Sequence, residues 1–459
     1  MPSGWSEGLY QTKTGLRILG GSIMTMGFGK YAIGYNQPVD KLPGRAWLTI
    51  AAGTTINLCL GCLYAWSVWL KYLTDESYML AHGWAGALTA EQASNPKSLC
   101  ILIFALLMIP GGKIQDKYGP TASATIGALF MGLGMIIAGT SKSYAGLLWG
   151  FGIGGGIAMG VAYAAPVPAT GKWVGPHQRG FTLGLTVAGY GGAAFYVSPL
   201  IKWMIVNQSL SSSFTVLGVA YLIVIFLCGL LLKWPEPGYV APPPPEAWTQ
   251  AQAAKGTSTT VDWVAGDMVK TWQFYALVLL FCLNTQAGLL IIGHAAKFIK
   301  PMLASGFILV SAGGALNALG RVGTGKYSDI IGRDKAYIVN AAAAAVCMFA
   351  LPSVIAAKSL FLAFLFCMIA YWVYGGGLAL MPSYTLDFFG PKNLGFNYGL
   401  VFIGWGMGAF MPKLGGWIRD VTGHYDGAFY VAGGLLILAI LIALVTKRPM
   451  ARSGAGVGT

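Results

Sequence analysis

Long apolar runs alternate with short polar segments along most of the chain. Each run has about 20 residues, which is the length that an α-helix needs to cross the hydrocarbon core of a bilayer. Because the bilayer offers no water to the backbone, each spanning segment is expected to be helical. The pattern predicts twelve transmembrane helices, at residues 46–71, 90–113, 121–140, 143–170, 181–204, 214–233, 272–296, 303–326, 336–356, 359–383, 395–416 and 427–446.

The longest interruption of this pattern separates the sixth predicted helix from the seventh. It contains Pro235, Pro237 and the run from Pro242 to Pro245, followed by a polar stretch. Proline at this density favours an extended spacer over a helix. We therefore divide the chain into an N-terminal arm (1–45), a first six-helix half (46–233), a linker (234–271), a second six-helix half (272–446) and a C-terminal tail (447–459).

The two halves share a motif between their second and third helices. The copies read Gly112-Lys-Ile-Gln-Asp116-Lys117-Tyr-Gly119 and Gly325-Lys-Tyr-Ser-Asp329-Ile-Ile-Gly332-Arg333. Glycine permits a tight turn, and aspartate can cap a neighbouring helix or pair with a basic residue. Two copies at equivalent places indicate a duplicated unit. We expect these turns to act as gates, with the candidate residues Gly112, Asp116, Lys117, Gly325, Asp329 and Arg333.

The composition is typical of a membrane protein, because 56% of the 459 residues are hydrophobic and only 10% are charged. The net charge of +14 could suggest a nucleic-acid partner. When both termini are placed in the cytoplasm, however, 19 of the 29 Lys and Arg residues fall on the cytoplasmic side, as the positive-inside rule requires. Anionic headgroups are a sufficient partner for this charge. We predict a multi-pass protein of the plasma or inner membrane that binds no nucleic acid.

Arg321 lies within the eighth predicted helix, several residues before its charged end. A guanidinium stays protonated in proteins, and a charge at membrane depth costs about 3 kcal/mol or more unless it faces a partner or a cavity. All 15 Asp and Glu residues lie in loops, tails or helix ends, so no buried carboxylate is at hand. One interpretation is that Arg321 extends to the lipid headgroups. The other is that it binds an anion from outside the protein.

Several stretches resemble one branch of a known carrier family. They are Ala188-Gly-Tyr190-Gly, the pair Asn317 and Arg321, Tyr371-Trp-Val-Tyr374-Gly-Gly-Gly, and Asn397-Tyr398-Gly399. Together with the repeated turns, they are similar to the oxalate:formate antiporter and monocarboxylate porter branch of the major facilitator superfamily. The resemblance implies an all-α fold of two six-helix halves, transport by alternating access, and a carboxylate-binding role for Arg321.

The chain departs from this branch in two places. Oxalate exchangers of the branch carry a lysine in the eleventh helix, where this chain has Trp405. Proton-coupled monocarboxylate porters of animals carry an aspartate one turn before the arginine, where this chain has Asn317, and a lysine in the first helix, where this chain has none. One cation neutralises one carboxylate, so a monocarboxylate such as lactate, pyruvate, acetate or formate is favoured. The alternative is an oxalate:formate exchanger that functions with one arginine.

Further candidates for the substrate site are polar aromatic residues at the depth of Arg321. They are Tyr64, Tyr163, Tyr190 and Tyr374, in the first, fourth, fifth and tenth helices. Two prolines just after Tyr163 are expected to break that helix and leave carbonyl groups open to a cavity. Trp405 is expected to narrow the cavity, and Asn317 to orient the guanidinium. Each tyrosine could instead simply pack, with its hydroxyl bonded to a neighbour.

His294, at the end of the seventh predicted helix, is the only histidine inside a predicted span. The ordinary pKa of histidine lies close to physiological pH, so His294 is a candidate proton carrier. The alternative is an interfacial residue at the membrane surface, beside Lys297 and Lys300.

The sequence shows no nucleophile with an adjacent base, no His–carboxylate metal spacing and no phosphate-binding loop, which argues against a membrane enzyme. All seven cysteines fall in apolar spans, and Cys59-x-x-Cys62 has no further metal ligand near it. We therefore expect a monomeric transporter with no metal or cofactor, whose substrate is a small organic anion and whose co-substrate could be the proton. A sensor or receptor built on a carrier fold is a third class that stays open.

Overall fold

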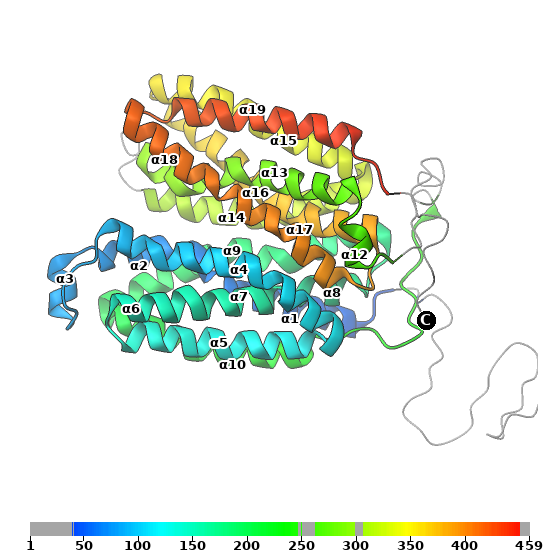
Figure 1. Cartoon of the computed structure of the whole chain (residues 1–459), viewed down its shortest axis with the longest axis horizontal. Helices are drawn as coiled ribbons and strands as arrows, with labels where there is room; N and C mark the ends of the chain where they lie inside the picture. Colours follow the sequence, from blue (N-terminus) through cyan, green and yellow to red (C-terminus); the bar gives the residue numbers. More distant parts are fainter. Residues whose placement is uncertain (1–38, 40, 247–248, 250–261, 299–305, 450–459) are drawn as a thin grey trace, which may run out of the picture.

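The computed structural model describes residues 39, 41–246, 249, 262–298 and 306–449. These residues form helices and connecting segments, with no β-strand among them. The helices form two bundles that lie side by side, α1 to α10 in one and α13 to α19 in the other (Figure 1). Most of the predicted N-terminal arm, much of the tail and the first residues of the eighth predicted span lie outside the described residues.

In the first half, each predicted span corresponds to one helix or to a stack of shorter ones. The elements are α1 (Gly44–Leu60), η1 (Gly61–Ala65), α2 (Trp66–Leu73), α3 (Glu76–Ala81), α4 (Ala90–Tyr118), α5 (Pro120–Thr140), α6 (Tyr144–Leu147), η2 (Leu148–Gly155), α7 (Gly156–Tyr163), α8 (Pro166–Gly171), η3 (Pro176–Gln178), α9 (Arg179–Asn207) and α10 (Leu210–Leu231). The short helix α3 lies at one end of the bundle (Figure 1).

The second half repeats this arrangement. Its elements are α12 (Ala265–Met268), α13 (Trp272–Phe298), α14 (Gly306–Ile331), α15 (Arg333–Ala356), α16 (Leu360–Phe389), α17 (Leu394–Gly408), α18 (Phe410–Thr422) and α19 (Asp426–Val445). All twelve predicted spans are therefore found, and the fold class predicted from the sequence is confirmed. Among the described residues, ten helices or helix stacks are long and apolar enough to cross a membrane by composition alone.

The two spans missing from those ten are α9 and α14. These two helices pack against each other across the boundary between the halves, and α4 packs against α17 in the same way. A helix that packs on protein along its length can carry more polar residues than one that faces lipid, because its polar groups find partners there. These two spans therefore lie at the boundary at which a transport site is expected.

Two helices break beside this boundary. The first span changes to a 3₁₀ turn at Gly61–Ala65, which contains Tyr64. The fourth span stops at Tyr163 and resumes at Pro166, because proline has no N–H for the preceding turn and its ring crowds the backbone there. Breaks of this kind are tolerated in a membrane only inside protein or beside a cavity. The break after Tyr163 is the one that the two prolines predict.

One end of the molecule carries the linker, and we call it the linker end. There α10 stops at Leu231, α13 starts at Trp272, α1 starts at Gly44 and α19 stops at Val445 (Figure 1). The extended residues 232–245 run along this end with few regular hydrogen bonds, as the prolines predict. Two segments of the linker contact the bundles. The backbone N–H of Trp263 donates to the carbonyl of Phe389, and the Tyr239 hydroxyl donates to the carbonyl of Trp173.

Candidate functional site

Arg321 extends from α14 across the boundary between the halves. It is only 1% exposed. Its Nε donates to Asn317 Oδ1 at 3.1 Å, one turn earlier on the same helix, and its Nη1 donates to the carbonyl of Val187 on α9 at 2.7 Å. The guanidinium is thus held by two hydrogen bonds and also interacts with the side chains of Tyr64 and Tyr163, while the buried Nη2 makes no hydrogen bond of standard geometry.

No carboxylate neutralises this charge in the described part of the chain. The ion pairs found there all involve other basic residues, and none includes Arg321. Carbonyl and amide oxygens supply dipoles but no net charge, and an unpaired buried cation is strongly unfavourable. Its burial also excludes an extended position in the headgroup region. Of the two interpretations from the sequence, the structure therefore favours a cation that faces the protein interior.

Glycine at position 191 leaves room for the guanidinium. A methyl group added to Gly191 on α9 would lie 2.8 Å from Arg321 Nε and 2.8 Å from Asn317 Oδ1. Such a contact is shorter than real side chains allow, so a larger residue would displace the arginine. The motif Ala188-Gly-Tyr190-Gly191 thus supplies both a tyrosine and a gap on one turn of α9.

The aromatic residues predicted from the sequence come together next to Arg321. The hydroxyls of Tyr64 and Tyr374 lie 2.7 Å apart, and Trp405 Nε1 donates to the Tyr374 hydroxyl at 2.9 Å. The ring of Tyr190 packs edge-on against Tyr64 and Tyr163, with centroids 5.3 Å apart in both pairs. We call Tyr64, Tyr163, Tyr190, Tyr374 and Trp405 the aromatic cluster. Five separate spans contribute to it, so it forms only when both halves are in place.

The guanidinium lies against this cluster. Its central carbon is 5.9 Å from the centre of the Tyr190 ring, a distance at which a cation is attracted by an aromatic face. A small cavity of about 20 Å³ lies nearby, lined by Tyr64, Gly191, Ala194, Ile292, Gly314, Asn317 and Tyr371. That volume suits a water molecule and is too small for an organic acid. The site is therefore closed in this structure, and a substrate enters only when the halves move apart.

Four contributors to the site were not among the predicted site residues. The carbonyl of Val187 binds Arg321, and a backbone group leaves no signal in a sequence. Phe104 and Phe402 pack on Trp405 at 5.2 and 5.1 Å, but phenylalanines in apolar spans are common and single out nothing. The Tyr398 side chain is fully buried, and its hydroxyl interacts with Tyr163 of the aromatic cluster. The motif that contains Tyr398 contributes to the family resemblance, which assigns no role to this tyrosine.

His294 lies away from this cluster, towards the end of α13 opposite the linker. Its Nε2 is 2.7 Å from the carbonyl of Pro412, and its Nδ1 is 3.1 Å from the hydroxyl of Tyr425. Both contacts belong to the second half, and neither partner is part of the aromatic cluster. The structure does not bring His294 together with Arg321, so a role in proton transfer stays a prediction.

The two repeated turns make matching contacts at the linker end. Asp116 accepts hydrogen bonds from the N–H groups of Gly395 and Phe396 at 3.2 and 2.8 Å, where α17 begins. Asp329 accepts from Gly180 and Phe181 at 2.8 Å each, where α9 begins. A carboxylate at a helix N-terminus satisfies free N–H groups and opposes the helix dipole. Each aspartate thus caps a helix of the other half, whereas the sequence suggested only a cap or a basic partner nearby.

The glycines that open the two motifs allow this close approach. A methyl group on Gly112 would lie 2.1 Å from the carbonyl oxygen of Gly395, and one on Gly325 would lie 2.1 Å from that of Gly180. Both contacts would be impossible. We call these paired glycine and aspartate contacts the gate contacts. They hold the two halves together at the linker end.

A model of the Major Facilitator Superfamily matches residues 68–386 and 309–456 of this chain. The chain belongs to the Major Facilitator Superfamily. It is therefore a multi-pass membrane transporter, which confirms the prediction of a transporter rather than an enzyme.

Named relatives narrow the comparison within this superfamily. The chain is 26% identical over 393 residues to the oxalate:formate antiporter of Oxalobacter formigenes, which covers 83% of this chain and 88% of that protein. It is 24% identical over 449 residues to apicoplast pyruvate carrier 1 of Toxoplasma gondii, and the match covers 78% of this chain and 81% of that carrier. A solved structure of the proton:xylose symporter XylE matches with a TM-score of 0.63 at 14% identity, over 88% of this chain and 96% of that one. That last likeness shows the fold alone.

An ion network lies beside one of the two sets of gate contacts. Arg333 pairs with Asp329 at 2.6 Å and with Asp387 at 3.1 Å, and Asp387 also pairs with Arg179 of the first half at 2.8 Å. Among the described residues, no ion pair includes Asp116 of the other repeated turn, and Lys117 there lies over the ring of its exposed neighbour Tyr118 at 5.0 Å. Of the six predicted gating residues, four contact the other half directly: Gly112, Asp116, Gly325 and Asp329. Arg333 is linked to the first half through Asp387 and Arg179, and Lys117 contacts a residue of its own helix.

Replacing Asp387 with Asn is expected to destabilise the transporter. Its carboxylate is almost buried and is shared by Arg179 and Arg333, so its loss leaves two largely buried cations short of negative charge. Removal of one partner of a buried pair typically costs about 3–5 kcal/mol. The check is the apparent melting temperature of purified protein, with Asp420→Asn as the control because that carboxylate is 74% exposed. Equal melting temperatures for both variants would contradict the expectation.

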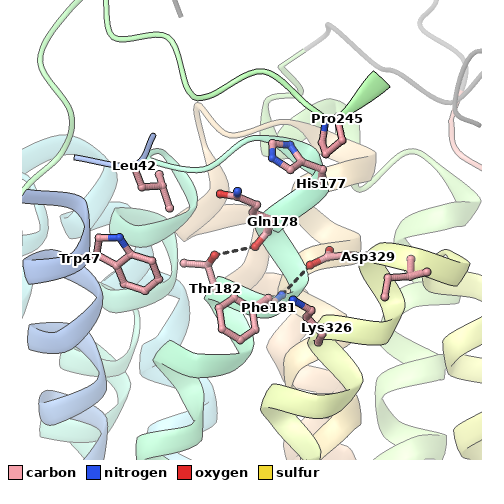
Figure 2. A pocket seen from close by; sticks show the side chains of 10 residues that line it. Leu42, Trp47, His177, Gln178, Phe181, Thr182, Pro245, Lys326 and Asp329 are labelled. Carbon is pink, nitrogen blue, oxygen red and sulfur yellow. Dashed lines mark hydrogen bonds between the residues drawn. The ribbon is translucent and has the colours of Figure 1, made fainter. Parts of the chain in front are cut away.

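A groove of about 610 Å³ follows the boundary between the halves at the linker end (Figure 2). Its lining comes from the segment before α1, from α1, η3, α9 and α14, and from the linker, and comprises Leu42, Trp47, His177, Gln178, Phe181, Thr182, Pro245, Lys326, Asp329 and Ile330. The Lys326 ammonium lies 5.2 Å from the centre of the Phe181 ring. None of these residues belongs to the aromatic cluster, but Asp329 and Phe181 belong to a gate contact. The groove therefore borders one set of gate contacts and lies apart from the Arg321 site.

Proposed function

We propose that this transporter carries small monocarboxylates, of the lactate, pyruvate, acetate or formate class, by alternating access. The single observation that supports this is the buried Nη2 of Arg321, which makes no hydrogen bond of standard geometry, in a site without a neutralising carboxylate. One guanidinium matches one carboxylate, and its planar fork suits two parallel hydrogen bonds. A dianion would bring one uncompensated charge into a buried site, which is unfavourable.

The substrate site in this proposal consists of Arg321, Asn317 and the aromatic cluster. Arg321 binds the carboxylate, and Asn317 orients the guanidinium through the bond to Nε. The hydroxyls of Tyr64 and Tyr374 and the indole of Trp405 are already linked to one another and close the site around the substrate. The relative named as a pyruvate carrier supports a monocarboxylate.

The second candidate is exchange of oxalate and formate. The observation that favours it is the 26% identity to a protein named oxalate:formate antiporter. Trp405 argues against it, because the oxalate exchangers that this chain resembles carry a cation at that place. Here Trp405 is bound to the hydroxyl of Tyr374.

Alternating access in this proposal uses the two ends of the bundle in turn. The gate contacts close the linker end in this structure, and they separate when the halves rock about the central site. By the positive-inside rule, the linker end and both termini face the cytoplasm. In this proposal the protein acts as a monomer in the plasma or inner membrane. Coupling is either to protons, with His294 as the candidate carrier, or to exchange of one anion for another.

Uptake into proteoliposomes tests this proposal. Vesicles with purified protein receive labelled lactate, formate or oxalate, with and without an internal counter-anion and with and without a pH gradient. We expect monocarboxylate uptake well above that of oxalate. Oxalate uptake far above that of every monocarboxylate would overturn the charge argument and favour the second candidate. Stimulation by the gradient would indicate symport, and stimulation by the counter-anion alone would indicate exchange and remove the role of His294.

A further inference from the structure

Three consecutive polar residues, Asn284, Thr285 and Gln286, are buried in the middle of α13. Thr285 donates to the carbonyls of Phe281 and Cys282. Gln286 donates to the carbonyl of Ala432 on α19 at 3.1 Å, which ties α13 to that helix. These two residues have structural partners for their donor groups, and Asn284 stands apart from them.

The side-chain amide of Asn284 is unpaired at both ends. Its Oδ1 and Nδ2 are buried and have no hydrogen-bond partner, and the residue is 1% exposed. An asparagine in a helix can donate to the carbonyl one turn earlier. That carbonyl, of Leu280, instead accepts a hydrogen bond from the Tyr337 hydroxyl at 2.7 Å. A buried amide without partners is costly, at about 1–3 kcal/mol for each unsatisfied group. Something that this chain does not supply should therefore bind it.

Asn284 lies on the face of α13 that borders the substrate site. Phe281, one turn earlier, packs on Phe402 at 5.8 Å, and Ile292, two turns later, lines the small central cavity. Gly288 lies between them against Tyr374, whose Cβ would be 2.4 Å, and whose ring would be 2.8 Å, from an added methyl group. Residues three, four, seven and eleven positions apart share a helix face. The amide of Asn284 therefore points towards the same region as these three neighbours.

The opposite helix leaves room for this amide. Gly377 of α16 lies one turn from Tyr374, and a methyl group added there would be 1.7 Å from Asn284 Oδ1. The amide thus lies directly against the α16 backbone. This contact is one helical turn from Tyr374, whose hydroxyl belongs to the aromatic cluster. It occupies the contact between α13 and α16, two helices of the second half that both reach the site.

We propose that Asn284 is a second polar contact for the substrate and binds its 2-hydroxyl group, which makes 2-hydroxymonocarboxylates the preferred class. This inference rests on the proposed function, in which Arg321 binds the carboxylate. An amide offers one acceptor and two donor hydrogens, and a hydroxyl offers a donor and acceptors, so the two satisfy each other. A 2-keto oxygen can only accept and leaves Oδ1 unpaired. An unsubstituted acid leaves the whole amide unpaired.

Equilibrium binding of three acids with the same carbon skeleton tests this inference. Lactate, pyruvate and propionate compete with a labelled monocarboxylate on the purified parent protein and on Asn284→Leu, with Gln286→Leu as the matched control on α13. In the parent protein we expect lactate to bind about 10- to 100-fold more tightly than propionate, with pyruvate between them. In Asn284→Leu this preference disappears, because lactate loses affinity and propionate does not. Gln286→Leu keeps it.

Folding of the variant gives a second readout. Replacement of an unpaired buried amide by an apolar group of similar size is neutral or stabilising, so Asn284→Leu should melt at the parent temperature or above it without substrate. A lower melting temperature with an unchanged preference for lactate would assign Asn284 to structure and overturn the inference. Equal affinity of the parent for lactate and propionate would also overturn it. If none of the three acids binds, the proposed function itself fails, and this inference fails with it.

Discussion

Arg321→Ala is expected to reduce monocarboxylate uptake to the level of liposomes without protein. In the parent, the guanidinium is the only group in the described substrate site that carries a positive charge, and its Nη2 makes no hydrogen bond of standard geometry. Truncation of one partner of a buried, hydrogen-bonded charge pair costs about 2–5 kcal/mol. That corresponds to a roughly 30- to 4,000-fold loss of affinity, which is enough to abolish measurable uptake at low substrate concentration.

Two further variants make this result specific. Arg321→Lys keeps the charge but loses the planar fork and the bond from Nε to Asn317, so it should retain only part of the activity. Arg419→Ala removes a half-exposed arginine of α18 and should leave uptake unchanged. Each variant needs a normal melting temperature, because Arg321 also binds the carbonyl of Val187. Full uptake by a well-folded Arg321→Ala would remove the assignment of the site.

Gly112→Leu is expected to keep the linker end open and to stop transport while leaving each half folded. A single added methyl group would already lie 2.1 Å from the Gly395 carbonyl oxygen, and a leucine side chain is much larger. The clash exists only when α4 and α17 meet at this end, so it disappears when the halves separate. Because alternating access requires both ends to close in turn, a transporter that cannot close one end should show no net uptake.

The distance between two spin labels across the linker end measures this effect. Tyr118 of α4 and Ile330 of α14 are 65% and 71% exposed and belong to different halves, which makes them suitable for cysteine labels in a background that lacks the native cysteines. We expect a longer distance in Gly112→Leu than in its parent. Gly434→Leu is the control, since nothing lies within 4 Å of a methyl group added there. A parent-like distance together with normal uptake would show that the gate contacts are not required.

The fold was predictable because its signal is local. A spanning helix must be about 20 apolar residues long, so the twelve apolar runs predict the twelve spans. The prolines after Tyr163 predict the break in the fourth span. Arg321 was predictable for a related reason, since a charge in an apolar run needs a partner and the positions of the acids showed that none was near. The four tyrosines of the aromatic cluster were predicted from their depth in the spans, and Trp405 from comparison with the resembling family; all five lie together in the structure.

The features that the sequence did not show depend on contacts between residues that are far apart in the chain. No pattern near Asp116 or Asp329 indicates that each caps a helix about 150 or more residues away. The Val187 carbonyl belongs to the backbone and carries no residue signature. Asn284 is an ordinary polar residue in an apolar span, and only the positions of its neighbours show that its amide is unpaired. Packing decides these features, and packing arises only when the chain has folded.

A calorimetric titration of the purified transporter with lactate, compared with the same titration of Arg321→Gln, tests the central claim most directly. Glutamine keeps a polar side chain at this place but removes the charge. If Arg321 is the cation that binds the substrate carboxylate, one lactate binds per parent molecule and no binding is measurable in the variant. Lactate binding of parent-like affinity in a well-folded Arg321→Gln protein would contradict the account.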